Sequence, residues 1–251
     1  MKFKICVPIP IKSANILEFK SRIENVMGFN PNLIEFRYDY IDDVQKITQN
    51  FITEMLDNVY PKIPVIFTFR SPHEGGKIKI DEKTRFNILK TLVLSQPHYL
   101  DIEMNTEKRM LKDILNLTNQ NDVNLIFSYH NFDETPSYEV LSDQIQKFLE
   151  IMKEEFGLDS NRLEKVIFKL VCKANDFEDN LISLKICKEF STRKMNIISF
   201  CMGTLGIFSR ICCVLNGSFL TYASIVEETA PGQINVKDMR ASLNLFLNRS
   251  N

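Results

Sequence analysis

The chain has 251 residues, of which 44% are hydrophobic and 25% charged, and its 31 Lys and Arg balance 32 Asp and Glu. This composition is typical of a globular protein and excludes intrinsic disorder. The balanced charge argues against a nucleic acid or an anionic membrane as partner. No uncharged stretch reaches the ~18–20 residues that cross a bilayer, and no signal-peptide cleavage site follows the N-terminus. We therefore expect a cytoplasmic protein.

The six cysteines form no CxxC pair and no cluster with histidine at the spacing of a zinc site. All but Cys187 lie in strongly apolar segments, so we expect buried thiols rather than disulfides or metal ligands.

Short runs rich in Val, Ile and Phe alternate with longer amphipathic segments along the whole chain. Strands are predicted at 3–9, 33–39, 64–70, 99–104, 124–130, 165–171, 196–202 and 218–224. Helices are predicted near 14–27, 43–58, 82–95, 106–119, 137–156, 177–190, 204–215 and 237–248. Strand followed by helix, eight times, predicts an α/β protein with a single (β/α)8 TIM-barrel domain over residues 1–251. The alternative is a doubly wound open sheet, but the glycine-rich turn typical of that fold does not occur.

Polar side chains recur at a spacing of two in four consecutive predicted strands, and the next strand has a single lysine, so five strands each direct polar groups to one face. In a closed barrel that face is the lumen, and barrel enzymes keep their sites at the C-terminal ends of the strands. For Asp39, Asp101 and Glu103 we favour ion pairs inside the barrel over contact with a substrate. The full set is Glu35, Arg37 and Asp39, then Thr68 and Arg70, Asp101 and Glu103, Ser128 and His130, and Lys169.

Three of these segments carry residues that could perform chemistry. Lys169 lies inside the apolar run VIFKLV; burial disfavours an ammonium ion, and a neutral amine can attack a ketone to form a Schiff base. His130 ends the fifth strand and could transfer protons, and Glu74 in the loop RSPHEGG could orient it. The alternatives are an ion-paired lysine at a sheet edge, a structural histidine and a solvated turn. His73 and His98 are interpreted as surface or helix-end residues.

Three arginines, Arg37, Arg70 and Arg210, stand in apolar surroundings and predict a small anionic substrate. No glycine-rich phosphate turn follows the last two strands, which favours a carboxylate. The segment ETAPGQINV (228–236) places Thr229 and Gln233 around a Pro-Gly turn, as in a mobile lid; an ordinary connecting loop is the alternative.

Seven motifs in this order, spanning residues 3–248, resemble the type I 3-dehydroquinate dehydratases: IEFRYD, FTFRSPHEGG, DIE, SYHNF, VIFKLV, MGTLGIFSR and APGQI. The resemblance implies a homodimeric barrel without metal or organic cofactor. It also implies a hydro-lyase of the shikimate pathway, which leads to chorismate and the aromatic amino acids. Such an enzyme converts 3-dehydroquinate into 3-dehydroshikimate through a lysine imine.

Residue by residue, the resemblance implies that Lys169 forms the Schiff base, that His130 transfers protons and that Glu74 orients His130. Arg210 would hold the substrate carboxylate. The remaining contacts implied are Glu35, Arg37 and Arg70 around the substrate hydroxyls, Thr229 and Gln233 on the lid, and Tyr222 and Met202 as candidate pocket residues.

The chain departs from the family pattern at three positions, none of them the lysine, histidine or glutamate. Thr229 replaces a frequent serine, Tyr222 a frequent phenylalanine, and Pro8 a frequent serine at the end of the first strand. We therefore expect altered affinity rather than lost activity.

Two other functions remain open. A class I aldolase or transaldolase shares the barrel and the lysine. A catalytically silent barrel could serve as a binding module, although an inactive site would be free to lose Lys169, His130 or Glu74.

Overall fold

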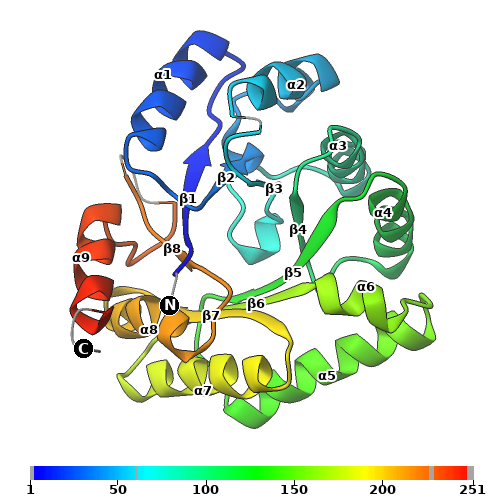
Figure 1. The fold of residues 1–251 in the computed structure, drawn as a ribbon. Coiled ribbons are helices and arrows are strands. Elements are labelled where there is room, and N and C mark those ends of the chain that lie inside the picture. The colour runs from blue at the N-terminus through cyan, green and yellow to red at the C-terminus, as the bar shows by residue number, and fades with distance from the viewer. Residues whose placement is uncertain (1–2, 60, 226–228, 248–251) are drawn as a thin grey trace. The chain divides into compact units, whose positions relative to one another are not determined.

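The computed structural model describes residues 3–59, 61–225 and 229–247. Within these ranges eight strands alternate with helices along the chain, which confirms the predicted alternation (Figure 1). The strands are β1 Ile5–Pro10, β2 Leu33–Arg37, β3 Val65–Thr68, β4 Tyr99–Glu103, β5 Asn124–Asn131, β6 Ile167–Lys173, β7 Asn196–Met202 and β8 Thr221–Tyr222. The helices are α1 Ile16–Met27, α2 Gln49–Asp57, α3 Glu82–Leu94, α4 Lys108–Gln120, α5 Tyr138–Glu154, α6 Ser160–Lys165, α7 Glu178–Thr192, α8 Ile207–Cys212 and α9 Val236–Leu247.

Two predicted helices are divided in the structure. The segment 43–58 consists of the 3₁₀ turn Val44–Lys46 and then α2, because Thr48 caps the helix and accepts a hydrogen bond from Phe51 N at 3.3 Å. The segment 204–215 contains α8 between the 3₁₀ turns Thr204–Gly206 and Cys213–Asn216.

Two further predictions were wrong. Helix α6 was missed: it starts at the cap Asp159, which accepts a hydrogen bond from Arg162 N at 2.8 Å, and it has no fully buried residue. It therefore leaves no amphipathic pattern in the sequence. The predicted strand 218–224 shrinks to β8, and just before it Ser218 Oγ donates to Leu220 O at 2.8 Å.

The chain forms two compact units, Val7–Ile126 and Met1–Cys6 with Phe127–Asn251, and the division between them falls inside β1 and β5. In the first unit β2 pairs in parallel with β3, and β3 with β4. In the second, β6 pairs in parallel with β7, and β1 with β8. The strand order of the sheet is β7-β6-β5-β4-β3-β2-β1-β8, the sequential parallel order of the predicted (β/α)8 fold.

Aromatic side chains hold the helices to one face of the strands in each unit. Phe19 of α1 meets Phe36 of β2 edge-on at 5.1 Å between ring centroids, and Phe36 stacks on Phe67 of β3 at 5.8 Å. In the other unit Phe148 of α5 meets Phe127 of β5 at 4.8 Å. Burying one such ring stabilises the fold by about 1.5–3 kcal/mol. Because neighbouring strand residues point to opposite faces, Glu35, Arg37 and Lys169 point away from the helices.

All six cysteines are buried and none forms a disulfide, which confirms the predicted burial; they are Cys6, Cys172, Cys187, Cys201, Cys212 and Cys213. Burial raises the pKa of the Cys213 thiol to about 11, so this group stays protonated at neutral pH.

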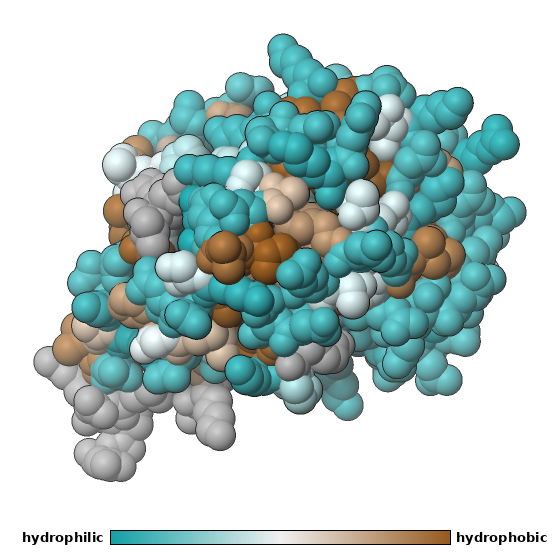
Figure 2. Space-filling view, turned by 90° about the horizontal axis from the view of Figure 1, so that it is seen from above, coloured by the Kyte–Doolittle hydropathy of each residue, from teal (hydrophilic) through white to brown (hydrophobic). Residues whose placement is uncertain are grey.

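The face of the molecule shown in Figure 2 is mainly hydrophilic, with hydrophobic residues in small groups. Among the described residues no helix is long and apolar enough to cross a membrane.

His98 was interpreted as a surface or helix-end residue, but it lies half-buried before β4 and accepts a hydrogen bond at Nδ1 from Val65 N, 3.2 Å away. Burial lowers the pKa of His98 below its ordinary value. A protonated ring could not accept this bond, so the neutral form belongs to the folded state.

We therefore expect His98 to make stability dependent on pH. Its pKa is lower in the folded chain than the ~6.5 of the unfolded chain, so its contribution is full above pH ~6.5 and is lost as the pH falls through the window below it. In urea unfolding at pH 7.5 and 5.5, His98→Asn, whose amide oxygen can accept the same bond, should lose less stability on acidification than wild type. The exposed His73→Asn should behave as wild type. Equal losses in all three proteins would contradict this assignment.

Candidate active site

In the unit Val7–Ile126, charged residues gather at the C-terminal ends of β2, β3 and β4. Glu35 of β2 is buried, and its Oε1 accepts a hydrogen bond from Thr68 Oγ1 of β3 at 2.6 Å. Arg37 ends β2 and binds Asp39 at two points, Nε to Oδ1 at 2.7 Å and Nη2 to Oδ2 at 2.8 Å. Burial alone would lower the pKa of Arg37, but the charge and hydrogen bonds of Asp39 outweigh it and raise this pKa.

Asp39 differs from its predicted place in a strand. Strand β2 ends at Arg37, and Asp39 lies in the 3₁₀ turn Tyr38–Tyr40, fully buried. In this turn the Asp39 carboxylate lies against the guanidinium of Arg37.

Arg70 lies just after β3 and contacts two carboxylates of β4. Its Nη2 is 2.8 Å from Asp101 Oδ2, and its Nη1 is 2.9 Å from Glu103 Oε1. Burial would lower the pKa of Arg70, but Asp101 and Glu103 raise it well above its ordinary value. The ion pairs predicted for Asp39, Asp101 and Glu103 are therefore confirmed.

Glu74 is not in a solvated turn: its side chain is 6% exposed, at the end of the 3₁₀ turn Pro72–Glu74. Asn105 Nδ2 donates to Glu74 Oε1 at 3.4 Å. The loop is compact because Gly76 N donates to Ser71 O at 2.9 Å. A Cβ on Gly76 would lie 2.0 Å from Arg70 O, so only glycine fits this approach.

In the other unit Lys169 lies in the middle of β6 and is 4% exposed. Its register partner on β7 is Ile198, and β6 stands between β5 and β7 in the strand order. The interpretation of Lys169 as an edge-strand residue is therefore wrong. Its Nζ lies 4.7 Å from the ring centroid of Tyr222 of β8, an arrangement in which the ring face attracts a cation.

His130 is the last residue but one of β5, one residue before the strand end at which the sequence placed it, and it is half-buried. Ser128, two residues earlier on the same face, is fully buried. The candidate pocket residue Met202 is buried at the end of β7. Each of these residues therefore lies on a strand, where the backbone fixes the direction of its side chain.

Arg210 of α8 is 1% exposed and is held by the segment that follows β8. Its Nη2 donates to Pro231 O at 3.2 Å, and its guanidinium lies 4.5 Å from the centroid of the Phe200 ring. Gly203 N donates to the same Pro231 oxygen at 3.2 Å. Gly232 has φ +73°, and a Cβ there would lie 2.3 Å from Gly203 O, so the Pro-Gly turn packs closely on the turn after β7.

The predicted lid residues Thr229 and Gln233 bind each other. Thr229 N donates to Gln233 Oε1 at 2.8 Å, and Gln233 Nε2 donates to Thr229 Oγ1 at 3.1 Å. Glu228, the first residue of the predicted lid, lies outside the described residues. From Thr229 onward the segment forms a closed loop that its own side chains and Arg210 hold in place.

Sequence analysis missed one residue of this cluster, Arg85 of α3, whose Nη2 contacts Glu103 Oε2. The sequence pattern of this helix could have identified the residue. The buried face of α3 carries Ile88, Leu89, Leu92 and Val93, and the same spacing leads back to position 85. An arginine on the apolar face of a helix predicts a buried cation that needs a carboxylate partner.

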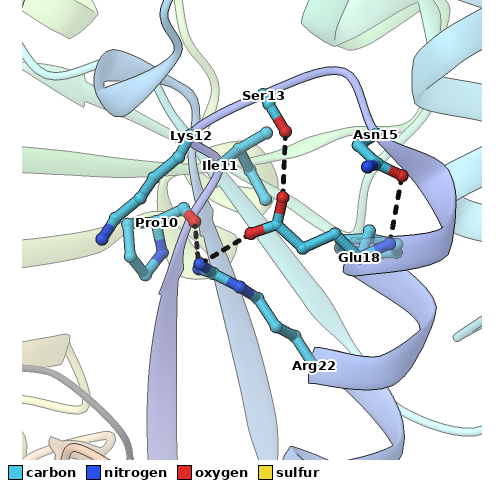
Figure 3. A pocket seen from close by; sticks show the side chains of 8 residues that line it. Pro10, Ile11, Lys12, Ser13, Asn15, Glu18 and Arg22 are labelled. Carbon is cyan, nitrogen blue, oxygen red and sulfur yellow. Dashed lines mark hydrogen bonds and ion pairs between the residues drawn. The ribbon is translucent and has the colours of Figure 1, made fainter.

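A shallow hollow lies beside the end of β1 and the start of α1, and Figure 3 shows the side chains that line it. Its polar groups bind one another: Ser13 Oγ donates to Glu18 at 3.2 Å, and Arg22 lies 2.9 Å from Glu18 and donates to Pro10 O at 3.1 Å. None of the predicted site residues lines it. The lining residues are Pro10, Ile11, Lys12, Ser13, Asn15, Glu18, Phe19 and Arg22.

Comparison with known proteins agrees with this arrangement. The family described as type I 3-dehydroquinase matches residues 5–249. The chain is 31% identical over 223 residues to the 3-dehydroquinate dehydratase of Thermococcus onnurineus, covering 88% of this chain and 90% of that protein. It is also 31% identical over 246 residues to the 3-dehydroquinate dehydratase of Alkaliphilus oremlandii, with coverages of 94% and 89%.

Solved structures give the same result. The 3-dehydroquinate dehydratase of Geobacillus kaustophilus matches with a TM-score of 0.84 at 27% identity, covering 100% of this chain and 93% of that one. The type I enzyme of Clostridium difficile, solved with covalently modified comenic acid, matches with a TM-score of 0.82 at 26% identity and coverages of 98% and 93%. The predicted (β/α)8 TIM-barrel fold is thereby confirmed. A family match over nearly the whole length, with relatives above 30% identity, shows that the chain belongs to the type I 3-dehydroquinase family of hydro-lyases.

Proposed function

We propose that this chain dehydrates 3-dehydroquinate to 3-dehydroshikimate through a Schiff base on Lys169, within one catalytic domain and without metal or organic cofactor. The observation that carries the proposal is the burial of Lys169 in the middle of β6. Membership of the type I family supports the same reaction. A lysine in the middle of a strand cannot move its amine far, so it can present that amine to a bound ketone.

The first chemical step is imine formation. Lys169 Nζ attacks the C3 carbonyl carbon of the substrate, and the carbinolamine loses water to give the protonated imine. The imine withdraws electrons from the neighbouring C2–H bond and makes that proton acidic. This is why the reaction needs no other electron sink.

His130 then removes the C2 proton, and the electron pair passes into the imine to form an enamine. The enamine expels the C1 hydroxyl, which leaves as water after the His130 imidazolium protonates it. Hydrolysis of the imine consumes one water and releases product and Lys169, so one water is lost overall. Glu74 holds the imidazole in the productive tautomer and stabilises its charged form.

The remaining predicted residues bind the substrate. Arg210 pairs with the carboxylate, and Glu35, Arg37 and Arg70 surround the hydroxyl groups. Tyr222 and Met202 are further candidates for contact with the substrate. Thr229 and Gln233 close over the ligand, a role supported by the bond between their side chains and by the contact of Arg210 with Pro231.

A product assay tests the reaction. The purified chain incubated with 3-dehydroquinate should generate the near-ultraviolet absorbance of a conjugated enone carboxylate and a product lighter by one water. Turnover of a phosphorylated sugar instead would favour the aldolase alternative. A chain that binds 3-dehydroquinate but never converts it would be the silent binding module.

Arg210→Ala should weaken substrate binding by about 2–5 kcal/mol, the cost of removing one half of a buried hydrogen-bonded charge pair. Arg210→Lys should restore only part of this, because an ammonium offers no two-point contact. Isothermal titration with product measures the loss, and the half-exposed Arg193→Ala serves as control. Unchanged affinity in Arg210→Ala would show that the carboxylate binds elsewhere.

The homodimer and the cytoplasmic location stay predictions from the sequence. Sedimentation equilibrium measures directly whether the chain forms a homodimer.

A further inference from the structure

Arg85 is a buried cation on a helix of the Val7–Ile126 unit. It contacts one of the charged residues at the C-terminal ends of β2, β3 and β4. It is 2% exposed on α3, and its Nη2 contacts Glu103 Oε2 of β4. Its other carboxylate neighbour, Glu82, is 3.8 Å away and largely exposed. The Arg85 Nε has no hydrogen-bond partner within the part of the chain that the structure describes. A buried arginine with an unsatisfied donor lowers the stability of the fold. Its presence here, in contact with Glu103, therefore requires an explanation.

The two carboxylate oxygens of Glu103 bind different partners. Oε2 contacts Arg85, whereas Oε1 accepts hydrogen bonds from Arg70 Nη1 and from Ser71 N, both at 2.9 Å. Holding one oxygen fixes the rotation of the carboxylate, and hence the position of the other. Arg85 thereby determines where the Ser71 backbone amide is bound.

Ser71 is the first residue of the loop that carries Glu74. Its carbonyl accepts hydrogen bonds from Glu74 N and Gly76 N, both at 2.9 Å. Movement at Ser71 would therefore be transmitted directly to the backbone of Glu74. The chain of contacts runs from Arg85 through Glu103 and Ser71 to Glu74, entirely inside one compact unit.

We propose that Arg85 is a positioning residue of the reaction: by holding Glu103 it fixes the turn that places the Glu74 carboxylate. The proposal rests on the proposed function, in which Glu74 orients the proton-transferring histidine. Arg85 itself touches no substrate.

The contacts predict an effect on turnover rather than on binding. Arg70 keeps its 2.8 Å contact with Asp101 when Glu103 rotates, so the arginine proposed to meet the substrate stays in place. Ser71 N loses its acceptor. Loss of Arg85 should therefore lower kcat while KM changes little.

The experiment compares Arg85→Met, Arg85→Lys and a matched control, Leu92→Ala, which removes a fully buried side chain from the same helix away from Glu103. Arg85→Met should lower kcat about 10–100-fold with KM within about threefold of wild type. Arg85→Lys should recover part of kcat, because a lysine can still pair with Glu103. Leu92→Ala should lower the melting temperature at least as much, with kcat near that of wild type.

A double-mutant cycle with Glu74→Gln distinguishes positioning from general destabilisation. If Arg85 acts through Glu74, Arg85→Met should lower kcat by less than about twofold in the Glu74→Gln background. If the two losses multiply, or if Arg85→Met keeps full kcat, the proposal is wrong. Should Arg85→Met fail to fold, Arg85→Lys enters the same cycle. Inactive wild-type enzyme that forms no borohydride adduct with 3-dehydroquinate would refute the proposed function instead.

Discussion

Lys169→Met is expected to abolish the covalent adduct and to lower turnover at least about 10⁴-fold, the scale on which loss of a covalent nucleophile acts. Wild type treated with 3-dehydroquinate and borohydride should gain one ligand mass on the peptide that contains Lys169. Methionine fills much of the volume of the lysine stem and is apolar, so the buried site in β6 should tolerate it. Intact mass, peptide mapping and a thermal melt give the three readouts.

Lys173 provides the matched control. It ends the same strand but is exposed. Lys173→Met should keep both the adduct and the activity. An adduct on any other lysine, or its persistence in Lys169→Met, would contradict the assignment of the nucleophile.

The fold was predictable because parallel strands buried on both faces leave continuous apolar runs, and the helices between them keep a regular apolar spacing. The predictions that were wrong each concern one short helix or strand and leave the order of the elements unchanged. A polar helix such as α6 buries no residue fully, so hydrophobic periodicity carries no trace of it. Strand β8 is only two residues long although the segment around it is apolar, so hydrophobicity alone did not give its bounds.

The candidate site was predictable as a set of residue types at strand ends, but not as a set of contacts. The alternation of strand residues placed Glu35 and Arg37 on one face of β2, and Lys169 on one face of β6. The sequence predicted an ion pair for Asp39 but could not show that the partner is Arg37, which Asp39 binds at two points from a turn where a strand was predicted. The contact of Arg85 with Glu103 joins a helix to a strand, and no local pattern specifies which carboxylate a buried arginine meets.

This pairing has a consequence for substrate recognition. Arg37 and Arg70 each contact carboxylates of the protein, so their charge is largely compensated within their own unit. Compensated arginines suit the recognition of neutral hydroxyl groups. Arg210, the arginine proposed to bind the substrate carboxylate, contacts a backbone carbonyl and an aromatic ring.

His130→Ala is expected to separate imine formation from proton transfer. Imine formation by Lys169 needs the amine, the ketone and some proton shuttling, whereas C2 deprotonation and imine hydrolysis both need a base placed beside the imine. The variant should form the Schiff base and stop there, so that a covalent adduct accumulates without borohydride and is visible in the intact mass. Loss of a general acid or base costs about 10²–10⁴ in rate, and His130 serves several proton transfers, so the upper end is expected.

Two further variants establish that this effect belongs to the His130 imidazole. Exposed His73→Ala should retain activity and trap nothing. Glu74→Gln should fall between wild type and His130→Ala, because it leaves the imidazole in place but removes the charge that orients it and favours its protonated form. If His130→Ala turned over within about tenfold of wild type and accumulated no adduct, His130 would be a structural histidine. Since deprotonation at C2 requires a base, another group beside the imine would then have to supply it.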